Sequence, residues 1–305
     1  VRMRDVPPMT LQPVDGAPIR VRGGGPVVSG SNLGLVRWLA GRGTATSAAR
    51  VRGPSCPPGD RARHTVRDAV VRSTAASYGG GMSADTYTGH VDAAGAPATR
   101  DLADITITKL SVGPMDNNAY LLVCKQTGEG VLIDAANDAD RILTLLTATS
   151  APTPLRTVIT THQHWDHHVA LPVVVTATGA RTAAGVPDAP ALPVTVDQPL
   201  DHGDTVALGD CTLEIIALRG HTPGSVAVLY RDPKGHGHLF TGDSLFPGGP
   251  GKTNSPQDFT SLMDDLESRV FGQLPDDTWV YPGHGDDTTL GRERASLPQW
   301  RARGW

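Results

Sequence analysis

Short apolar runs separated by polar residues dominate the chain from residue 105 onward. Ile105, Ile107 and Leu110 alternate with polar positions, and continuous apolar runs follow at 120–124 and 131–133. Alternation with a period of two, and short apolar runs bounded by turn residues, are typical of β-strands. The glycine-containing turn at 127–130 joins the second and third runs. These residues therefore predict three consecutive strands.

Apolar positions spaced three and four residues apart predict helices between further strands. Ile142, Leu145 and Leu146 share one helical face, and Asn137 is predicted to be the N-cap of that helix. Helices are predicted at 138–147, 169–178 and 259–270, with a short one after Gly291. Strands are predicted at 158–160, 205–208, 211–218, 225–230, 238–241 and 279–281. This order favours an α+β layered domain over a regular βαβ array.

Composition excludes several classes of protein. The chain has 305 residues and three widely spaced cysteines, which form neither a disulfide framework nor a cysteine-based zinc module. No apolar run approaches the length of about 18–20 residues that a membrane span requires. A chain with 35 Gly and 25 Pro is also unsuited to long coiled coils.

Charge and composition change sharply near residue 82. Residues 1–81 contain twelve Arg, no Lys and four Asp, a formal charge of +8 against −12 for residues 82–305. This Gly- and Pro-rich segment is predicted to be disordered. Arginine without lysine is typical of translated GC-rich DNA outside a reading frame, so we expect the working protein to start near Met82. A phosphate-binding arm and a transit peptide are the alternatives. No secretory signal is recognised, which predicts a cytoplasmic protein.

One dense cluster of metal-ligand side chains directly follows the strand predicted at 158–160. It contains His162, His164, Asp166, His167 and His168. Two histidines two residues apart in extended chain point to the same side. The cluster can offer two imidazoles to one cation, and a carboxylate with an imidazole to a second. These ligand types suit Zn²⁺, and also iron or manganese.

Three further blocks each place one ligand-type side chain in a Gly-rich turn after an apolar strand. They are 220–225 (Gly-His-Thr-Pro-Gly-Ser), 241–246 (Thr-Gly-Asp-Ser-Leu-Phe) and 281–285 (Tyr-Pro-Gly-His-Gly). Glycine permits the backbone to pass close to a crowded site. With the histidine cluster, their order resembles the metallo-β-lactamase superfamily across residues 104–290, and is most similar to its glyoxalase II (hydroxyacylglutathione hydrolase) branch. The resemblance implies that residues 82–305 form a hydrolase domain with an αββα sandwich and metals at one edge of its two sheets.

The resemblance also implies a ligand set for two divalent metal ions, with Zn²⁺ favoured and iron or manganese open. The first ion would be bound by His162, His164 and His221, the second by Asp166, His167 and His284, and both by Asp243. A hydroxide bridging the ions would attack a small thioester, with Asp166 and Asp243 as catalytic residues. Lys252 would hold a carboxylate of the thiol carrier, although Thr253-Asn254 follows where related thioesterases often have an aromatic residue.

Other site residues have simpler predicted roles. Asp134, at the end of a strand, is expected to orient a ligand. Trp165 is expected to cover the metals or to pack beneath them. His168 is interpreted as a helix-start residue, with support of the metal ligands as the alternative, and His238 is interpreted as a surface residue.

Alternative functions share this scaffold. A mononuclear iron persulfide dioxygenase, or a hydrolase of another ester or a lactam, would use many of the same residues. The −12 charge of residues 82–305 argues against nucleic acid as a partner. No membrane partner is expected, and the sequence does not determine the acyl group, the carrier thiol or the oligomeric state.

Overall fold

The computed structural model describes residues 87–148 and 153–304, together with the backbone of four short strands nearer the N-terminus. The chain divides into two compact units, Val1–Tyr78 and Gly79–Trp305. The first unit contains a sheet in the order β2-β1-β3-β4, formed by β1 (Met9–Pro13), β2 (Ile19–Val21), β3 (Val27–Gly30) and β4 (Arg50–Val51).

Most of the segment at 1–81 lies outside the described residues. Its predicted disorder, the start near Met82 and the domain boundary there stay predictions.

A seven-stranded sheet forms the first half of the second unit, in the order β11-β10-β9-β8-β7-β6-β5. Strands β5 to β8 pair antiparallel, whereas β8 to β11 pair parallel. The strands are β5 (Ala98–Asp101), β6 (Ile105–Val112), β7 (Asn117–Cys124), β8 (Gly130–Ile133), β9 (Leu155–Thr160), β10 (Arg181–Gly185) and β11 (Gln198–Leu200).

A six-stranded sheet forms the second half, in the order β12-β13-β14-β15-β18-β19. Its strands are β12 (Thr205–Leu208), β13 (Cys211–Ala217), β14 (Val226–Arg231), β15 (Gly237–Gly242), β18 (Trp279–Pro282) and β19 (Thr288–Thr289). Within it only β15 and β18 pair parallel. A small hairpin of β16 (Leu245–Phe246) and β17 (Gly249–Pro250) lies beside this sheet.

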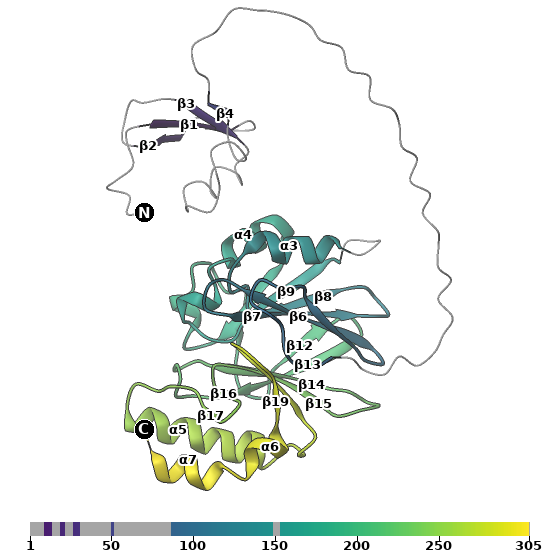
Figure 1. Ribbon diagram of the computed structural model, residues 1–305, viewed down its shortest axis with the longest axis vertical. Helices are drawn as coiled ribbons and strands as arrows, with labels where there is room; N and C mark the ends of the chain where they lie inside the picture. The colour runs from purple at the N-terminus through teal and green to yellow at the C-terminus, as the bar shows by residue number, and fades with distance from the viewer. Residues whose placement is uncertain are drawn as a thin grey trace, which may run out of the picture. The chain divides into compact units, whose positions relative to one another are not determined.

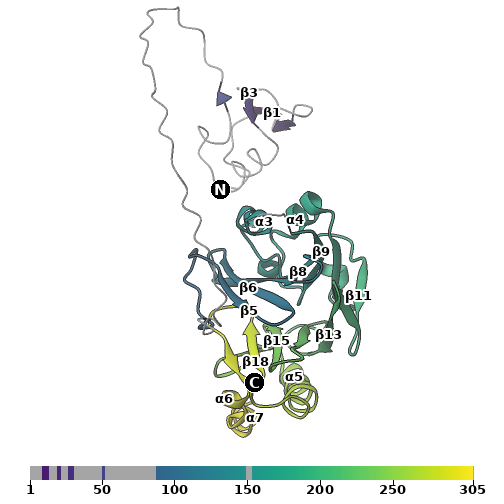
Figure 2. The ribbon, with the colours of Figure 1, turned by 90° about the vertical axis from the view of Figure 1, so that its right-hand side faces the viewer.

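Helices cover the outer face of each sheet, so the second unit has four layers (Figures 1 and 2). On the first sheet lie α3 (Ala139–Thr147) and α4 (Leu171–Thr178). On the second lie α5 (Pro256–Asp265), the π-helical turn η4 (Leu266–Phe271), α6 (Leu290–Arg294) and α7 (Leu297–Arg303). Short 3₁₀ turns are η2 (Trp165–His167) and η3 (Ala189–Ala191). Within the described residues, no helix combines the length and apolarity needed to cross a bilayer.

The central core lies between the two sheets. Ile107 and Ile159 of the first sheet and Val228 and Phe240 of the second belong to one cluster of buried side chains. Separate apolar clusters join each sheet to its helices. Burying both faces of both sheets requires an outer helical layer on each side, and the αββα sandwich predicted from the sequence is confirmed.

One local prediction is wrong. The N-cap of α3 is Asp138, not Asn137, and it has a φ of 46° with no capping bond from its side chain. The Asp138 carboxylate instead accepts from the Gly113 amide at 2.7 Å. The start of α3 is therefore held by the turn between β6 and β7, which is a tertiary contact.

Candidate metal centre

The four sequence blocks meet at one edge of the sandwich, each at the C-terminal end of a strand. The histidine cluster follows β9 in the first sheet, and the other three blocks follow β13, β15 and β18 in the second. Because β15 and β18 are parallel neighbours, with Gly242 opposite Pro282, Asp243 and His284 lie side by side. Gly283 is required between them, since a Cβ there would lie 2.2 Å from Asp243 Oδ1.

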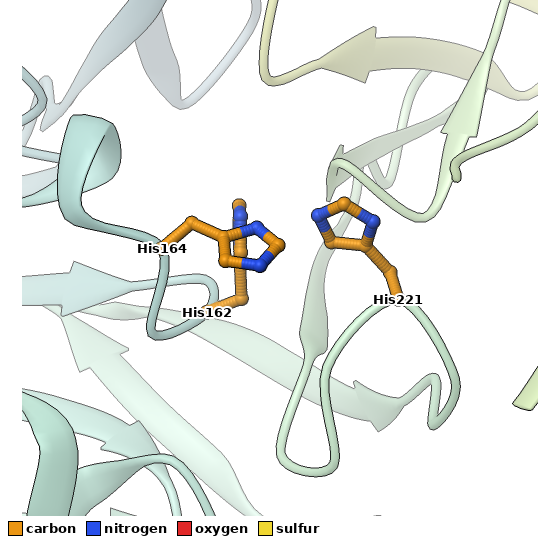
Figure 3. Close-up of side chains that lie close together, drawn as sticks. All are labelled: His162, His164 and His221. Carbon is orange, nitrogen blue, oxygen red and sulfur yellow. The ribbon is translucent and has the colours of Figure 1, made fainter. Parts of the chain in front are cut away.

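Three histidines form the first ligand group: His162, His164 and His221. One nitrogen of each lies within 4.8 Å of the others, and their ring centroids are 4.6–4.9 Å apart. In Figure 3, His162 and His164 project from one loop and face His221 on the opposite loop. Two loops that are distant in sequence therefore supply one three-nitrogen site.

The second ligand group is Asp166, His167 and His284, and Asp243 lies between the two groups. His284 Nε2 is 3.4 Å from Asp166 Oδ2 and 3.2 Å from His167 Nε2. Asp243 Oδ1 is 3.3 Å from His167 Nε2, whereas its Oδ2 is 3.6 Å from His221 Nε2. One carboxylate thus faces both groups, as a shared ligand would.

The second nitrogen of three of these histidines is engaged by a neighbouring acceptor. His167 Nδ1 donates to Asp134 Oδ2 at 2.9 Å. His221 Nδ1 donates to the Lys252 carbonyl at 2.6 Å, and His284 Nδ1 to the Met115 carbonyl at 2.9 Å. Such partners fix the tautomer and the orientation of a metal-binding imidazole, so each Nε2 is directed into the site. Asp134 lies where its predicted orienting role requires.

Burial and charge act in opposite directions on the ionisable groups of the site. Burial lowers the pKa of His162, and neighbouring His167 lowers it further. Burial alone would also lower the pKa of His167, but the hydrogen bond to Asp134 and the nearby carboxylate of Asp243 outweigh it and raise that pKa to about 10. Burial would raise the pKa of Asp243, yet the neighbouring imidazoles of His167 and His284 hold it well below its usual range. The carboxylate at the centre is therefore ionised.

Buried nitrogens without partners show that the site fits divalent cations. Among the residues that the structure describes, the Nε2 atoms of His162 and His221 are buried and have no hydrogen-bond partner. Leaving such an atom unsatisfied costs about 1–3 kcal/mol, unless the atom binds a group outside the chain. Imidazole nitrogens with carboxylates are the ligand set that Zn²⁺, iron and manganese accept.

Sequence analysis missed a buried carboxylate that joins the two loops of the first ligand group. Asp188, just before η3, is fully buried. Its oxygens accept from the amide of Gln163 at 2.9 Å, the amide of Gly224 at 2.7 Å and the hydroxyl of Thr222 at 2.5 Å. Gln163 lies between His162 and His164, and Thr222 follows His221. No sequence pattern marks this residue, because two of its three partners are backbone amides.

A buried ion pair that was also missed supports the loop that carries His284. Lys109 Nζ lies 2.6 Å from Asp287 Oδ1 and donates to the carbonyls of Gly89 and Gly285, both at 2.7 Å. The side-chain amide of Asn118 also donates to the Gly285 carbonyl, at 2.9 Å. Breaking a buried ion pair costs about 3–5 kcal/mol, so this pair fixes the loop beside the second ligand group.

The structure settles three further sequence interpretations. His238 is fully buried, not a surface residue, and its Nδ1 bonds to the Tyr281 hydroxyl at 2.9 Å. Trp165 is 63% exposed, so it does not pack beneath the site. His168 is the C-cap of η2 and α4 begins at Leu171 with Ala170 as its N-cap, so His168 does not start a helix; its Nε2 contacts the Gln163 carbonyl at 3.1 Å.

Fold and site together define a protein with an αββα sandwich and ligands for two divalent metal ions at one edge. The metallo-β-lactamase superfamily matches residues 112–284, more than half of the chain. The chain belongs to this superfamily.

Among curated proteins, the hydroxyacylglutathione hydrolase of Polaromonas sp. (strain JS666 / ATCC BAA-500) is 34% identical over 169 residues. That match covers 55% of this chain and 62% of the relative, so the chain spans less than two thirds of its length. It confirms the resemblance to the hydroxyacylglutathione hydrolase branch.

Two solved structures share the fold. ETHE1 from Myxococcus xanthus is 30% identical with a TM-score of 0.56, covering 64% of this chain and 84% of that one. TTHA1623, solved in a di-iron-bound form, is 29% identical with a TM-score of 0.52, covering 63% of this chain and 98% of that one.

Proposed function

We propose that this chain hydrolyses a small thioester at a pair of divalent metal ions, as a hydroxyacylglutathione hydrolase-like enzyme. The observation that carries the proposal is the position of Asp243, which faces both ligand groups. The first ion would be held by His162, His164 and His221, and the second by Asp166, His167 and His284. Asp243 would bind both, and the ligand types favour Zn²⁺ with iron or manganese as alternatives.

The side chains prepare this site for acyl chemistry. When bound, two divalent ions polarise a carbonyl and lower the pKa of water towards neutrality. The acceptors on His167, His221 and His284 keep each Nε2 directed at the centre. Asp243 places its oxygens between the two groups and Asp166 places its own within the second, and we propose both as catalytic residues. A thiol has a pKa near 8.5, so it leaves as thiolate with little help from an acid.

Turnover of a thioester panel tests the proposal. Purified full-length protein, assayed with 2-hydroxyacyl thioesters of glutathione and of other thiols, is expected to release free thiol in proportion to its metal content. Elemental analysis of the same preparation identifies the metal and its stoichiometry. If metal-loaded protein hydrolyses no thioester, the proposed function is wrong.

The persulfide dioxygenase alternative makes a different prediction. A mononuclear iron enzyme does not need the second ligand group, which is complete here. Iron-loaded protein that consumes oxygen with a persulfide, and leaves thioesters intact, would favour that alternative.

A pocket beside the first ligand group fits the carrier end of such a substrate. It has a volume of about 370 Å³ and is lined by Lys252, Thr253, Phe259 and Arg303, among others. The Lys252 carbonyl bonds to His221, so its exposed side chain starts next to the site. We propose that the Lys252 ammonium binds a carboxylate of the carrier thiol.

Replacing Lys252 with alanine should raise KM for an acidic thioester about tenfold, equivalent to about 1.4 kcal/mol, while kcat changes little. The reason is that a contact distant from the reacting carbonyl stabilises ground state and transition state equally. Lys234→Ala removes an exposed lysine from the turn between β14 and β15 and should leave both constants unchanged. Equal losses in kcat and kcat/KM would contradict the role of Lys252.

A further inference from the structure

Two large apolar side chains stand exposed beside the second ligand group. Within residues 87–148 and 153–304, four large apolar side chains are exposed: Met115, Trp165, Val169 and Val186. A single exposed apolar side chain is ordinary, so location decides whether it has a role. Met115 is 49% exposed and lies in the turn that contacts His284. Trp165 is 63% exposed and lies in the turn that carries Asp166 and His167.

Met115 is held next to His284 by the backbone. Its carbonyl accepts from His284 Nδ1 at 2.9 Å, and the adjacent Asp116 carbonyl accepts from the Gly285 amide at 3.3 Å. Asn117 forms an isolated β-bridge with His284. The turn between β6 and β7 is therefore fixed against the second ligand group, and the Met115 side chain is presented from it to solvent.

Phe246 lies beside the same group, and Trp165 belongs to the turn η2 that carries Asp166 and His167. Trp165 directly precedes Asp166, whose Oδ2 is 3.4 Å from His284 Nε2. The ring of Phe246, in β16, lies 6.4 Å from the ring of His284. We call Met115, Trp165 and Phe246 the apolar rim. Met115 and Phe246 adjoin His284 of the second ligand group, and Trp165 lies between His164 and Asp166, whereas Lys252 adjoins the first group through His221.

A charged side chain beside the first ligand group and apolar side chains beside His284 would give a substrate that spans both groups one orientation. With its charged carrier at Lys252 and its carbonyl at the centre, the acyl group extends to the apolar rim. We propose that the apolar rim binds the acyl group, and that this group carries an apolar aliphatic or aromatic chain. The inference rests on the proposed thioester hydrolysis and specifies its substrate class. Apolar acyl chains match exposed apolar side chains, because burying both removes apolar surface from water.

A chain-length series tests the inference. Straight-chain acyl thioesters of one carrier thiol, from acetyl to octanoyl, are assayed with full-length metal-loaded protein. We expect kcat/KM to rise about two- to fourfold with each methylene that the rim covers. The double variant Met115→Ser/Trp165→Ser should flatten this dependence, whereas Trp165→Phe should retain most of it. Val186→Ser removes an equally exposed apolar side chain outside the rim and should keep the full dependence.

Four other outcomes would each contradict a different part of the inference. Hydrolysis that is independent of chain length in the native protein rejects the acyl site and leaves the proposed thioesterase intact. A slope that persists in the double variant, with metal content unchanged, excludes the rim as its cause. A dimer in sedimentation that the double variant converts to a monomer would assign the rim to self-association instead. Hydrolysis of no thioester at all rejects the proposed function and this inference with it.

Discussion

Replacing Asp243 with alanine is expected to reduce kcat/KM for thioester hydrolysis about a thousandfold and to lower the metal content of the protein. Among residues 87–148 and 153–304, Asp243 is the carboxylate that faces both ligand groups, at 3.3 Å from His167 Nε2 and 3.6 Å from His221 Nε2. Its removal takes from both ligand groups the carboxylate that lies between them. A metal ion contributes several kcal/mol to transition-state stabilisation, and about 4 kcal/mol corresponds to a thousandfold in rate. Elemental analysis and steady-state kinetics on one preparation measure both effects.

A surface carboxylate serves as the matched control for Asp243. Asp264 is 60% exposed and pairs with Arg301 outside the site, so Asp264→Ala should keep native activity and metal content. Circular dichroism would show whether each variant retains its secondary structure. A folded Asp243→Ala protein with native activity would contradict the shared-ligand role.

Replacing Asp188 with asparagine is expected to weaken metal binding at the first ligand group by about 10–100-fold, the range found for groups that orient ligands. The native carboxylate accepts from Gln163, Gly224 and Thr222 and thereby holds both histidine loops. An asparagine side chain keeps one acceptor oxygen but turns its NH₂ group towards a donor, so at least one partner loses its acceptor at a cost of about 1–3 kcal/mol. Metal titration against a chelator measures the affinity, and thermal unfolding measures the accompanying loss of stability.

Asp197 provides the control for Asp188. It also accepts from a backbone amide and a hydroxyl, both of Thr182, but it contacts neither histidine loop. Asp197→Asn should lose some stability and keep native metal affinity. If folded Asp188→Asn binds metal as tightly as the native protein, Asp188 does not position the ligands.

The strands with strong apolar patterns were predictable because burial on both faces of a layered sheet imposes that pattern. Strands β6, β7, β8, β13 and β14 lie close to their predicted positions. Strand β10, with the sequence Arg-Thr-Ala-Ala-Gly, was missed because small residues carry little apolar signal. It is a strand because it pairs parallel with β9. The strand propensity of the local residues does not predict pairing with a distant segment.

The ligand set was predictable for a different reason. Metal chemistry restricts ligands to a few residue types, and four blocks containing them in order leave few other interpretations. The structure brings all seven side chains together at one edge of the sandwich. Their assignment to two metal ions remains the proposal that the Asp243 experiment tests.

The sequence by itself determined the layered fold class and the side chains that could bind metal, since apolar periodicity and ligand chemistry are properties of local residues. Only the tertiary structure decided that Asp188 joins the two histidine loops, that Lys109 and Asp287 support His284, and that Met115 is exposed beside it. The physical reason is that these roles depend on backbone amides, carbonyls and solvent exposure. Any sequence supplies such groups, and folding alone places them next to particular side chains.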